Sequence, residues 1–315
     1  MRIDVHAHYF NNEYIDLLAG FGQTEMFLEP ARRMLQPRAA DLEERFGMMD
    51  RAKVDLQVLS VSGVTPYFAD ERSAVAGARH ANDLYAQLVR ENPGRFAAFA
   101  VLPLPHMDAS LREYTRAVDE LGMLGVTFTT SVLGKSLADE TFAPMYEEMN
   151  RRHEVLFVHP AGLACDSPTI VRDNLTWPLG APFEDTLCAL QLLQSGFVRR
   201  YPNIKTILPH LGGTLPFLIQ RLDHMAQRFM PGKGVPREES RKYWYDTVNG
   251  YIPALQMSVE TFGADRIVFG TDYPFWKGDA HQLCVDFITQ AGLSAAQTNA
   301  IFSGTVQALF DGRKK

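Results

Sequence analysis

Short runs of apolar and β-branched residues recur along the chain, separated by stretches of helical periodicity. We predict eight strands from these runs, at residues 2–7, 55–60, 96–103, 125–130, 154–160, 205–210, 243–249 and 266–271. Among the intervening stretches, residues 41–52, 110–121 and 142–152 have helical patterns. Strands that alternate with helices form parallel sheets through right-handed crossovers.

The number of units favours a closed α/β architecture. Eight βα units in a chain of 315 residues fit a (β/α)8 TIM barrel better than an open, doubly wound sheet. The open sheet is further weakened because no GxGxxG turn follows the first strand. No linker or repeat divides the sequence, so we expect a single domain over residues 1–315.

The first strand carries two histidines. In IDVHAH, residues 3, 5 and 7 are apolar and alternate with Asp4, His6 and His8. Strand alternation places both imidazoles on one face, where they form a clamp for a divalent metal or a polar pair on an exposed face. Asp4 is expected on the same face one layer deeper. It is either an acceptor for a ligand imidazole or a polar contact of the barrel interior.

Further candidate ligands stand at the ends of other predicted strands. His159 ends the fifth strand, His210 ends the sixth, and Asp272 follows the eighth. The carboxyl ends of barrel strands meet at one rim, where barrel enzymes build their sites. A single histidine at such a place is more often a core residue. Together with His6 and His8, these residues predict a metal site.

Two connections are longer than a tight turn requires. Residues 9–40 follow the first strand and residues 161–183 follow the fifth, and both contain proline, glycine and aromatic side chains. Because both leave the carboxyl ends of strands, we interpret them as lid-like insertions over the barrel mouth rather than plain surface loops. Trp177 in the second insertion and Phe275 after the last strand are candidate walls for a flat substrate.

Composition excludes several classes of function. Hydrophobic residues make up 46% of the chain and charged residues 22%, as in soluble globular proteins. A net charge of −6 with scattered basic residues argues against nucleic-acid binding, and no apolar run is long enough for a membrane span. The three cysteines are far apart and the chain begins without a signal-peptide pattern, so we expect a cytoplasmic protein.

The motifs resemble a known family. The stretches IDVHAH, GMMDRAKVDLQVLS, NPGRFAAFAVLP, LFVHP, PHLGGTLPF and GTDYPF are similar to those of the amidohydrolase superfamily, and within it of the metal-dependent decarboxylases. That branch includes 2-amino-3-carboxymuconate-6-semialdehyde decarboxylase and the ortho-hydroxybenzoate decarboxylases. The resemblance implies a non-oxidative decarboxylase (a carbon–carbon lyase) that acts on a small aromatic or unsaturated carboxylic acid.

The resemblance also implies roles for individual residues. His6, His8, His159 and Asp272 would hold one divalent metal, with zinc expected and manganese, cobalt or iron also compatible with this donor set. His210 and Asp272 would be the acid/base residues, and no organic cofactor is implied. Relatives with two metals bridge them through a lysine that ends the fourth strand. Here that strand ends in threonines, so we expect a single ion.

Two arginines are candidates for binding a substrate carboxylate. By resemblance these are Arg221, which would reach the site of a neighbouring subunit and implies a homodimer, and Arg33 in the first insertion. Arg32 and Arg38 compete with Arg33 because this loop aligns poorly, and Arg221 could instead form a salt bridge on a helix surface.

Other functions remain open at the level of sequence. The same constellation could hydrolyse a lactone, ester or amide, because a metal lowers the pKa of its bound water. A barrel that only binds ligands is a third possibility, disfavoured by the presence of both His210 and Asp272.

Overall fold

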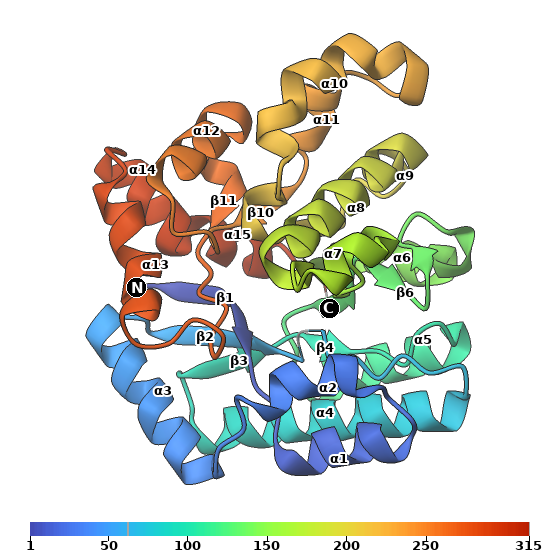
Figure 1. Cartoon of the computed structure of the whole chain (residues 1–315), viewed down its shortest axis with the longest axis vertical. Coiled ribbons are helices and arrows are strands. Elements are labelled where there is room, and N and C mark those ends of the chain that lie inside the picture. The colour runs from blue at the N-terminus through green and yellow to red at the C-terminus, as the bar shows by residue number, and fades with distance from the viewer. Residues whose placement is uncertain (62, 315) are drawn as a thin grey trace.

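A computed structural model describes residues 1–61 and 63–314, with a ring of parallel strands at its centre (Figure 1). Each of the eight predicted strands is present in these residues. Their bounds are β1 (Ile3–His8), β2 (Leu56–Ser60), β3 (Phe96–Ala98) with β4 (Ala100–Val101), β5 (Val126–Thr129), β8 (Val155–His159), β9 (Lys205–Leu208), β10 (Trp244–Asp246) and β11 (Ile267–Val268). Only Phe99 separates β3 from β4, so these two form the third strand.

Hydrogen bonds close the strands into a barrel. One sheet has the order β1-β2-β3 and another the order β11-β10-β9-β8-β5-β4, with all of these neighbours parallel. The remaining gap lies between β11 and β1. It is bridged by the amide of Val5, 2.9 Å from the carbonyl of Phe269, and by the amide of Asp272, 2.7 Å from the carbonyl of His6. The predicted (β/α)8 barrel is therefore confirmed. A short antiparallel hairpin, β6 (Ser131–Val132) and β7 (Lys135–Ser136), follows β5.

Helices surround the strands (Figure 1). The α-helices are α1 (Asn12–Gly20), α2 (Glu25–Arg32), α3 (Arg38–Ala52), α4 (Glu71–Glu91), α5 (Met107–Thr115), α6 (Ala143–Arg152), α7 (Pro168–Arg172), α8 (Ala181–Ser195), α9 (Phe197–Arg200), α10 (Leu215–Phe229), α11 (Pro236–Ser240), α12 (Ile252–Phe262), α13 (Asp279–Gln290), α14 (Ala295–Asn299) and α15 (Thr305–Asp311). Shorter 3-10 or π turns are η1 (Arg116–Glu120), η2 (Glu140–Phe142), η3 (Ala164–Asp166), η4 (Thr176–Gly180), η5 (His210–Gly212), η6 (Ala264–Arg266) and η7 (Ala300–Gly304). None of the helices in the described residues is long and apolar enough to cross a membrane.

Local sequence signals mark the ends of α8, which is important for the site. Pro182 lies in its first turn, where a missing amide hydrogen costs nothing. Gly196 ends the helix in the left-handed conformation that glycine adopts without strain. These two residues account for where the helix begins and ends.

The interior of the barrel is apolar at one end. Val5, Val58, Phe99 and Phe157 belong to one buried cluster, which also includes Leu309 of α15. Side chains from successive strands fill a barrel of this size in layers, so this end is a packed core rather than a channel. The polar residues of the strand ends lie above it, since the ring of His6 is 5.1 Å from that of Phe157.

Both long connections fold into helices. Residues 9–40 contain α1, α2 and the start of α3, and residues 161–183 contain η3, α7, η4 and the start of α8. Pro30 of the first segment and Trp177 of the second line the same cavity. Both segments therefore border this cavity, and their role as lids stays a prediction.

Candidate metal centre

The two histidines of β1 point into the barrel, next to a register shift in this strand. The pairing of β1 with β2 shifts register between Asp4 and Ala7, so the strict alternation predicted from the sequence is interrupted there. His8 is paired with Ser60, and its ring lies 4.9 Å from that of His6. The two imidazoles therefore share a face, as predicted.

Asp4 does not share that face. Its carboxylate accepts hydrogen bonds from the side chain of Gln57 at 2.9 Å and from the hydroxyl of Thr271 at 2.6 Å. Gln57 in turn accepts from Arg45 of α3, so Asp4 belongs to a buried polar network between the strands and a helix. Of the two roles considered for Asp4, no bond from its carboxylate to a ligand imidazole is found among the described residues, and the carboxylate instead makes polar contacts within the barrel wall.

The predicted ligands converge. His6, His8, His159 and Asp272 each offer one ligand atom, and these atoms lie within 4.8 Å of one another. Ligand atoms that are each about 2.1 Å from one ion lie up to about 4.2 Å apart, so a small inward movement suffices to hold a metal. Nε2 of His6 is buried without a hydrogen-bond partner, as expected for an atom that binds a cation. The residues present fit a divalent metal.

A second layer of contacts orients the imidazoles. Nδ1 of His6 lies 2.6 Å from Oδ2 of Asp246, and Nδ1 of His8 lies 2.8 Å from Oγ of Ser60. Nδ1 of His159 lies 3.0 Å from the carbonyl oxygen of Pro160, which can only accept. A carboxylate and a carbonyl can only accept, so Nδ1 of His6 and Nδ1 of His159 donate their protons, which leaves Nε2 as the atom of these two rings that would bind a metal.

The electrostatics of the centre favour a cation. Burial lowers the pKa of His8 to about 4. Burial, together with the neighbouring rings of His8 and His6, also holds the pKa of His159 well below its usual value. Burial acts in the same direction on His6, but Asp246 and Asp272 outweigh it and raise its pKa to about 10. Burial would raise the pKa of Asp272, but the imidazoles of His6 and His8 beside its carboxylate lower it and hold Asp272 ionised. Two buried carboxylates thus face the neutral imidazoles of His8 and His159 and a His6 ring that keeps its proton. A divalent cation would replace that proton as the balancing charge.

His210 stands beside the centre rather than in it. It follows β9 with a φ of 53°, and its amide lies 2.9 Å from Oδ1 of Asp246. Its Nδ1 lies 2.8 Å from Oδ2 of Asp185 on α8. Burial alone would lower the pKa of His210, but Asp185 and Asp246 outweigh it and raise that pKa.

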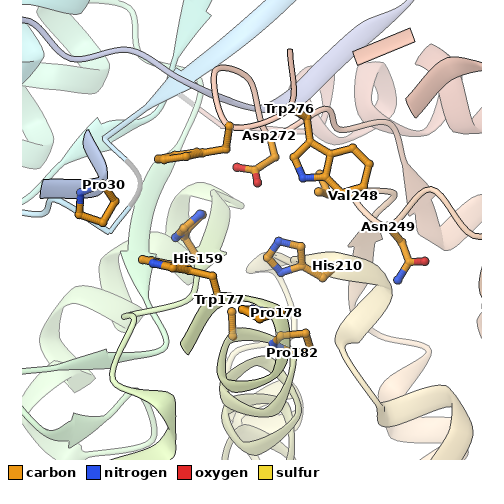
Figure 2. A pocket seen from close by; sticks show the side chains of 12 residues that line it. Pro30, His159, Trp177, Pro178, Pro182, His210, Val248, Asn249, Asp272 and Trp276 are labelled. Carbon is orange, nitrogen blue, oxygen red and sulfur yellow. The ribbon is translucent and has the colours of Figure 1, made fainter. Parts of the chain in front are cut away.

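A cavity of about 450 Å³ opens next to these side chains (Figure 2). The residues that line it are Pro30, His159, Trp177, Pro178, Ala181, Pro182, His210, Val248, Asn249, Asp272, Phe275 and Trp276. In Figure 2 the rings of His159 and His210 and the carboxylate of Asp272 surround one space. These polar groups thus share the cavity with apolar and aromatic side chains. Trp177 and Phe275 line this cavity, and their contact with a substrate stays a prediction.

The two candidate arginines lie elsewhere. Arg33 forms an ion pair with Glu29 and its side chain is 71% exposed. Arg221 is exposed on α10, and no ion pair of Arg221 is found within the described residues. Neither side chain lines the cavity of its own chain, because Arg33 bonds along its helix and α10 lies at the periphery (Figure 1).

Several residues of the site could not be inferred from sequence. Asp246 ends β10 but lies in the middle of the predicted strand 243–249, so the predicted bounds did not place it at the rim. Asp185 and Arg45 lie on helices, where nothing in the local pattern distinguishes them from surface charges. Both are buried, and Arg45 donates to the carbonyl of His8.

Comparison with known proteins agrees with this geometry. An amidohydrolase family model matches residues 3–312. The 2-amino-3-carboxymuconate-6-semialdehyde decarboxylase of Dictyostelium discoideum is 30% identical over 299 residues, which cover 89% of this chain and 83% of that protein. A 6-methylsalicylic acid decarboxylase of Aspergillus aculeatus is 30% identical over 293 residues, covering 89% of this chain and 86% of that protein.

A solved structure is similar over almost the whole length. It is a dihydroxybenzoic acid decarboxylase from Polaromonas sp. JS666, crystallised with manganese and the inhibitor 2-nitroresorcinol. Its TM-score is 0.82 and its sequence identity 27%, and the match covers 98% of this chain and 96% of that chain. With a barrel, a ligand cluster and a family model that agree from end to end, this chain belongs to the amidohydrolase family.

Proposed function

We propose that this chain is a metal-dependent, non-oxidative decarboxylase of a small aromatic or unsaturated carboxylic acid. The observation that carries the proposal is a buried His3Asp ligand cluster that shares an apolar, aromatic-walled cavity with His210. The relatives described above are named decarboxylases. The hydrolase alternative is not favoured, because none of those three relatives is named as a hydrolase.

The cofactor of the proposed reaction is one divalent cation. Three imidazole nitrogens and one carboxylate suit zinc, although manganese, cobalt and iron accept the same donors. We propose zinc as the native ion and His6, His8, His159 and Asp272 as its ligands. Such a cation would bind the carboxylate of a substrate and spread the charge that develops as carbon dioxide leaves.

His210 is the acid that we propose for protonating the substrate carbon. Loss of carbon dioxide leaves an electron pair on carbon, so a proton must arrive there. Asp272 is a poor proton carrier because the neighbouring imidazoles of His6 and His8 hold its pKa low against the effect of burial. The pKa of His210 is raised, mainly by Asp185 against the effect of burial, and its ring borders the cavity. A raised pKa increases the share of imidazole that carries a proton and can donate it.

The cavity favours a flat substrate with one carboxylate. Trp177, Phe275 and Trp276 give it aromatic walls, and Asn249 adds an amide that can bind a hydroxyl or carbonyl substituent. No lysine or arginine of the described residues lines it. A second carboxylate would therefore find a cation only if another subunit supplied one.

Arg221 is the candidate for such a contribution, and we propose a homodimer. Phe217 is 76% exposed on α10, and Arg221 lies four residues further along the same helix face. An interface over Phe217 would bury this ring and carry Arg221 to the partner molecule. Arg33 stays a prediction with weaker support, since it is paired with Glu29.

Three further expectations belong to this proposal. Residues 1–315 would fold as one domain, and the segments 9–40 and 161–183 would act as lids over the cavity that they line. Cys165, Cys188 and Cys284 are free thiols, which is compatible with the reducing cytoplasm that we propose as the location.

The test is release of carbon dioxide from a panel of ortho-hydroxybenzoates and muconate-type acids by the metal-loaded protein. Esters and lactones of similar size are assayed in parallel. We expect carbon dioxide from at least one acid, and a His210→Asn variant that retains its metal but is at least about 100-fold slower. Cleavage of esters or lactones without release of carbon dioxide would overturn the proposal.

A further inference from the structure

Asp185 is a fully buried carboxylate whose contact with His210 is its sole side-chain hydrogen bond in the described residues. Its side chain has no exposed surface, and Oδ2 lies 2.8 Å from Nδ1 of His210. Oδ1 is buried without a hydrogen-bond partner. Burial of an incompletely bonded carboxylate costs free energy, and the raised pKa of Asp185, about 6, reflects that desolvation. Because its burial is costly, the carboxylate of Asp185 is better explained by a role in the site than by a contribution to stability.

The packing of α8 fixes this contact. The loop that follows β9 passes so close to the start of α8 that a Cβ atom on Gly213 would lie 2.0 Å from the carbonyl oxygen of Pro182. The hydroxyl of Thr186 accepts a hydrogen bond from the amide of Thr214 at 2.8 Å. Asp185 is therefore held between two residues that clamp α8 to the loop carrying His210.

The neighbouring residue anchors α8 on the other side. Glu184 accepts hydrogen bonds from the amides of Ala161 at 2.8 Å and Gly162 at 3.1 Å, in the loop that follows His159. It also accepts from the hydroxyl of Thr130 at 2.9 Å. The start of α8 is thus tied to three strand ends, so that the carboxylate of Asp185 has little freedom to leave His210.

We propose that Asp185 is a positioning residue that keeps a proton on Nδ1 of His210 and thereby directs Nε2 to the cavity. A carboxylate accepts from Nδ1–H in both protonation states of the ring. The remaining 17% exposure of the His210 side chain agrees with a ring that is open on its other edge. The kinetic consequence rests on the proposed function, whereas the choice of tautomer does not.

The first test is ¹⁵N NMR of histidine-labelled, zinc-loaded protein, with His210 assigned by comparison with His210→Asn. At a pH where the ring is neutral, we expect a protonated Nδ1 and an unprotonated Nε2. In Asp185→Leu, which has a similar shape but no acceptor, Nδ1–H should no longer be the dominant form. A wild-type ring protonated on Nε2, or an unchanged tautomer in Asp185→Leu, would overturn the proposal. The wild-type spectrum decides even if the leucine variant does not fold.

The second test is kinetic. Asp185→Leu should lower kcat by about 10- to 100-fold with KM changed less than about twofold, and Asp185→Asn, which keeps an acceptor, should recover part of the loss. In a His210→Asn background the same substitution should have no further effect, because both act through one group. Additive losses would mean a general structural role and would overturn the proposal.

A carboxylate outside the cavity provides the matched control for Asp185. Asp119→Asn removes a carboxylate paired with Arg152 outside the cavity lining and should leave both kcat and the His210 tautomer unchanged. If the wild-type protein releases no carbon dioxide, the proposed function fails while the NMR experiment still decides the role of Asp185.

Discussion

Two residues of the site have left-handed backbone conformations, which residues other than glycine rarely adopt. His210 has a φ of 53° and Asp272 a φ of 59°. Such residues cost on the order of 1 kcal/mol each and persist only where neighbouring contacts hold them. The amide of His210 is bound by Asp246 and that of Asp272 by the carbonyl of His6. The strain is thus compensated within the site itself.

Asp246 connects these contacts, and its removal should weaken metal binding. Its oxygens bind the ring of His6 and the amides of His210 and Val248. We expect Asp246→Asn to reduce metal affinity by about 10- to 100-fold, because loss of an outer partner misorients the ligand imidazole. Competition with a fluorescent chelator measures this affinity. The exposed Asp265 gives the control Asp265→Asn, and equal affinities in both variants would contradict the role of Asp246.

Among secondary-structure elements, β1 shows where sequence reasoning succeeds and where it stops. Alternation correctly predicted that His6 and His8 share a face. It failed for Asp4, because the register shift depends on pairing with β2 and leaves no mark in the residues themselves. The partners Asp185 and Arg45 were missed for a similar reason, since only tertiary packing distinguishes a buried charge on a helix from an exposed one.

The lack of a side chain at Gly213 lets the loop after β9 pack closely against α8. Besides the carbonyl of Pro182, a Cβ there would lie 2.6 Å from the hydroxyl of Thr186. We expect Gly213→Ala to lower the free energy of unfolding by about 1–3 kcal/mol and to impair turnover, because α8 must move away from His210. Urea unfolding checks this. A Cβ on Gly20 would meet nothing within 4 Å, so Gly20→Ala is the control, and equal stability of both variants would argue against the clamp.

Buried His281 on α13 predicts part of the acid sensitivity of the fold. Burial, together with Arg45 and Arg51, lowers its pKa to about 4 from the usual 6.5, and its Nε2 lacks a hydrogen-bond partner. The unfolded chain therefore binds more protons between these values. The stability that depends on a neutral His281 is complete above pH 6.5 and is lost as the pH falls towards 4.

His281→Leu should remove this dependence. Between about pH 7.5 and pH 5 the wild type should lose about 2 kcal/mol more unfolding free energy than the variant. Urea titrations of both metal-loaded proteins at the two pH values provide the comparison. Parallel losses would show that His281 does not titrate in this range.

At the scale of the whole molecule, the barrel explains why so much of the site was predictable. Strand ends that are far apart in sequence meet at one rim, so the order of strands grouped His6, His8, His159, His210 and Asp272. The family resemblance then selected the four that form the ligand cluster. The order of strands says nothing about contacts between two molecules. Arg221 lies on the exposed helix α10, so its proposed role in substrate binding depends on whether the protein forms a dimer.

The proposed dimer predicts a specific sensitivity of α10. Phe217→Glu should shift the protein to monomers in sedimentation velocity, because a charge would replace an exposed ring at the centre of the proposed interface. Met26, 54% exposed on α2, gives the control Met26→Glu, which should leave the assembly unchanged. A wild-type monomer, or a dimer that survives Phe217→Glu, would contradict this interface.

The most direct test of a one-metal decarboxylase is a titration of activity against metal. The protein is stripped with a chelator, zinc or manganese is added in known amounts, bound metal is counted by mass spectrometry, and carbon dioxide release is followed with the best acid of the panel. We predict no activity without metal and a linear rise that reaches its plateau near one ion per chain. Activity that survives removal of the metal, or that requires two ions per chain, would contradict the account.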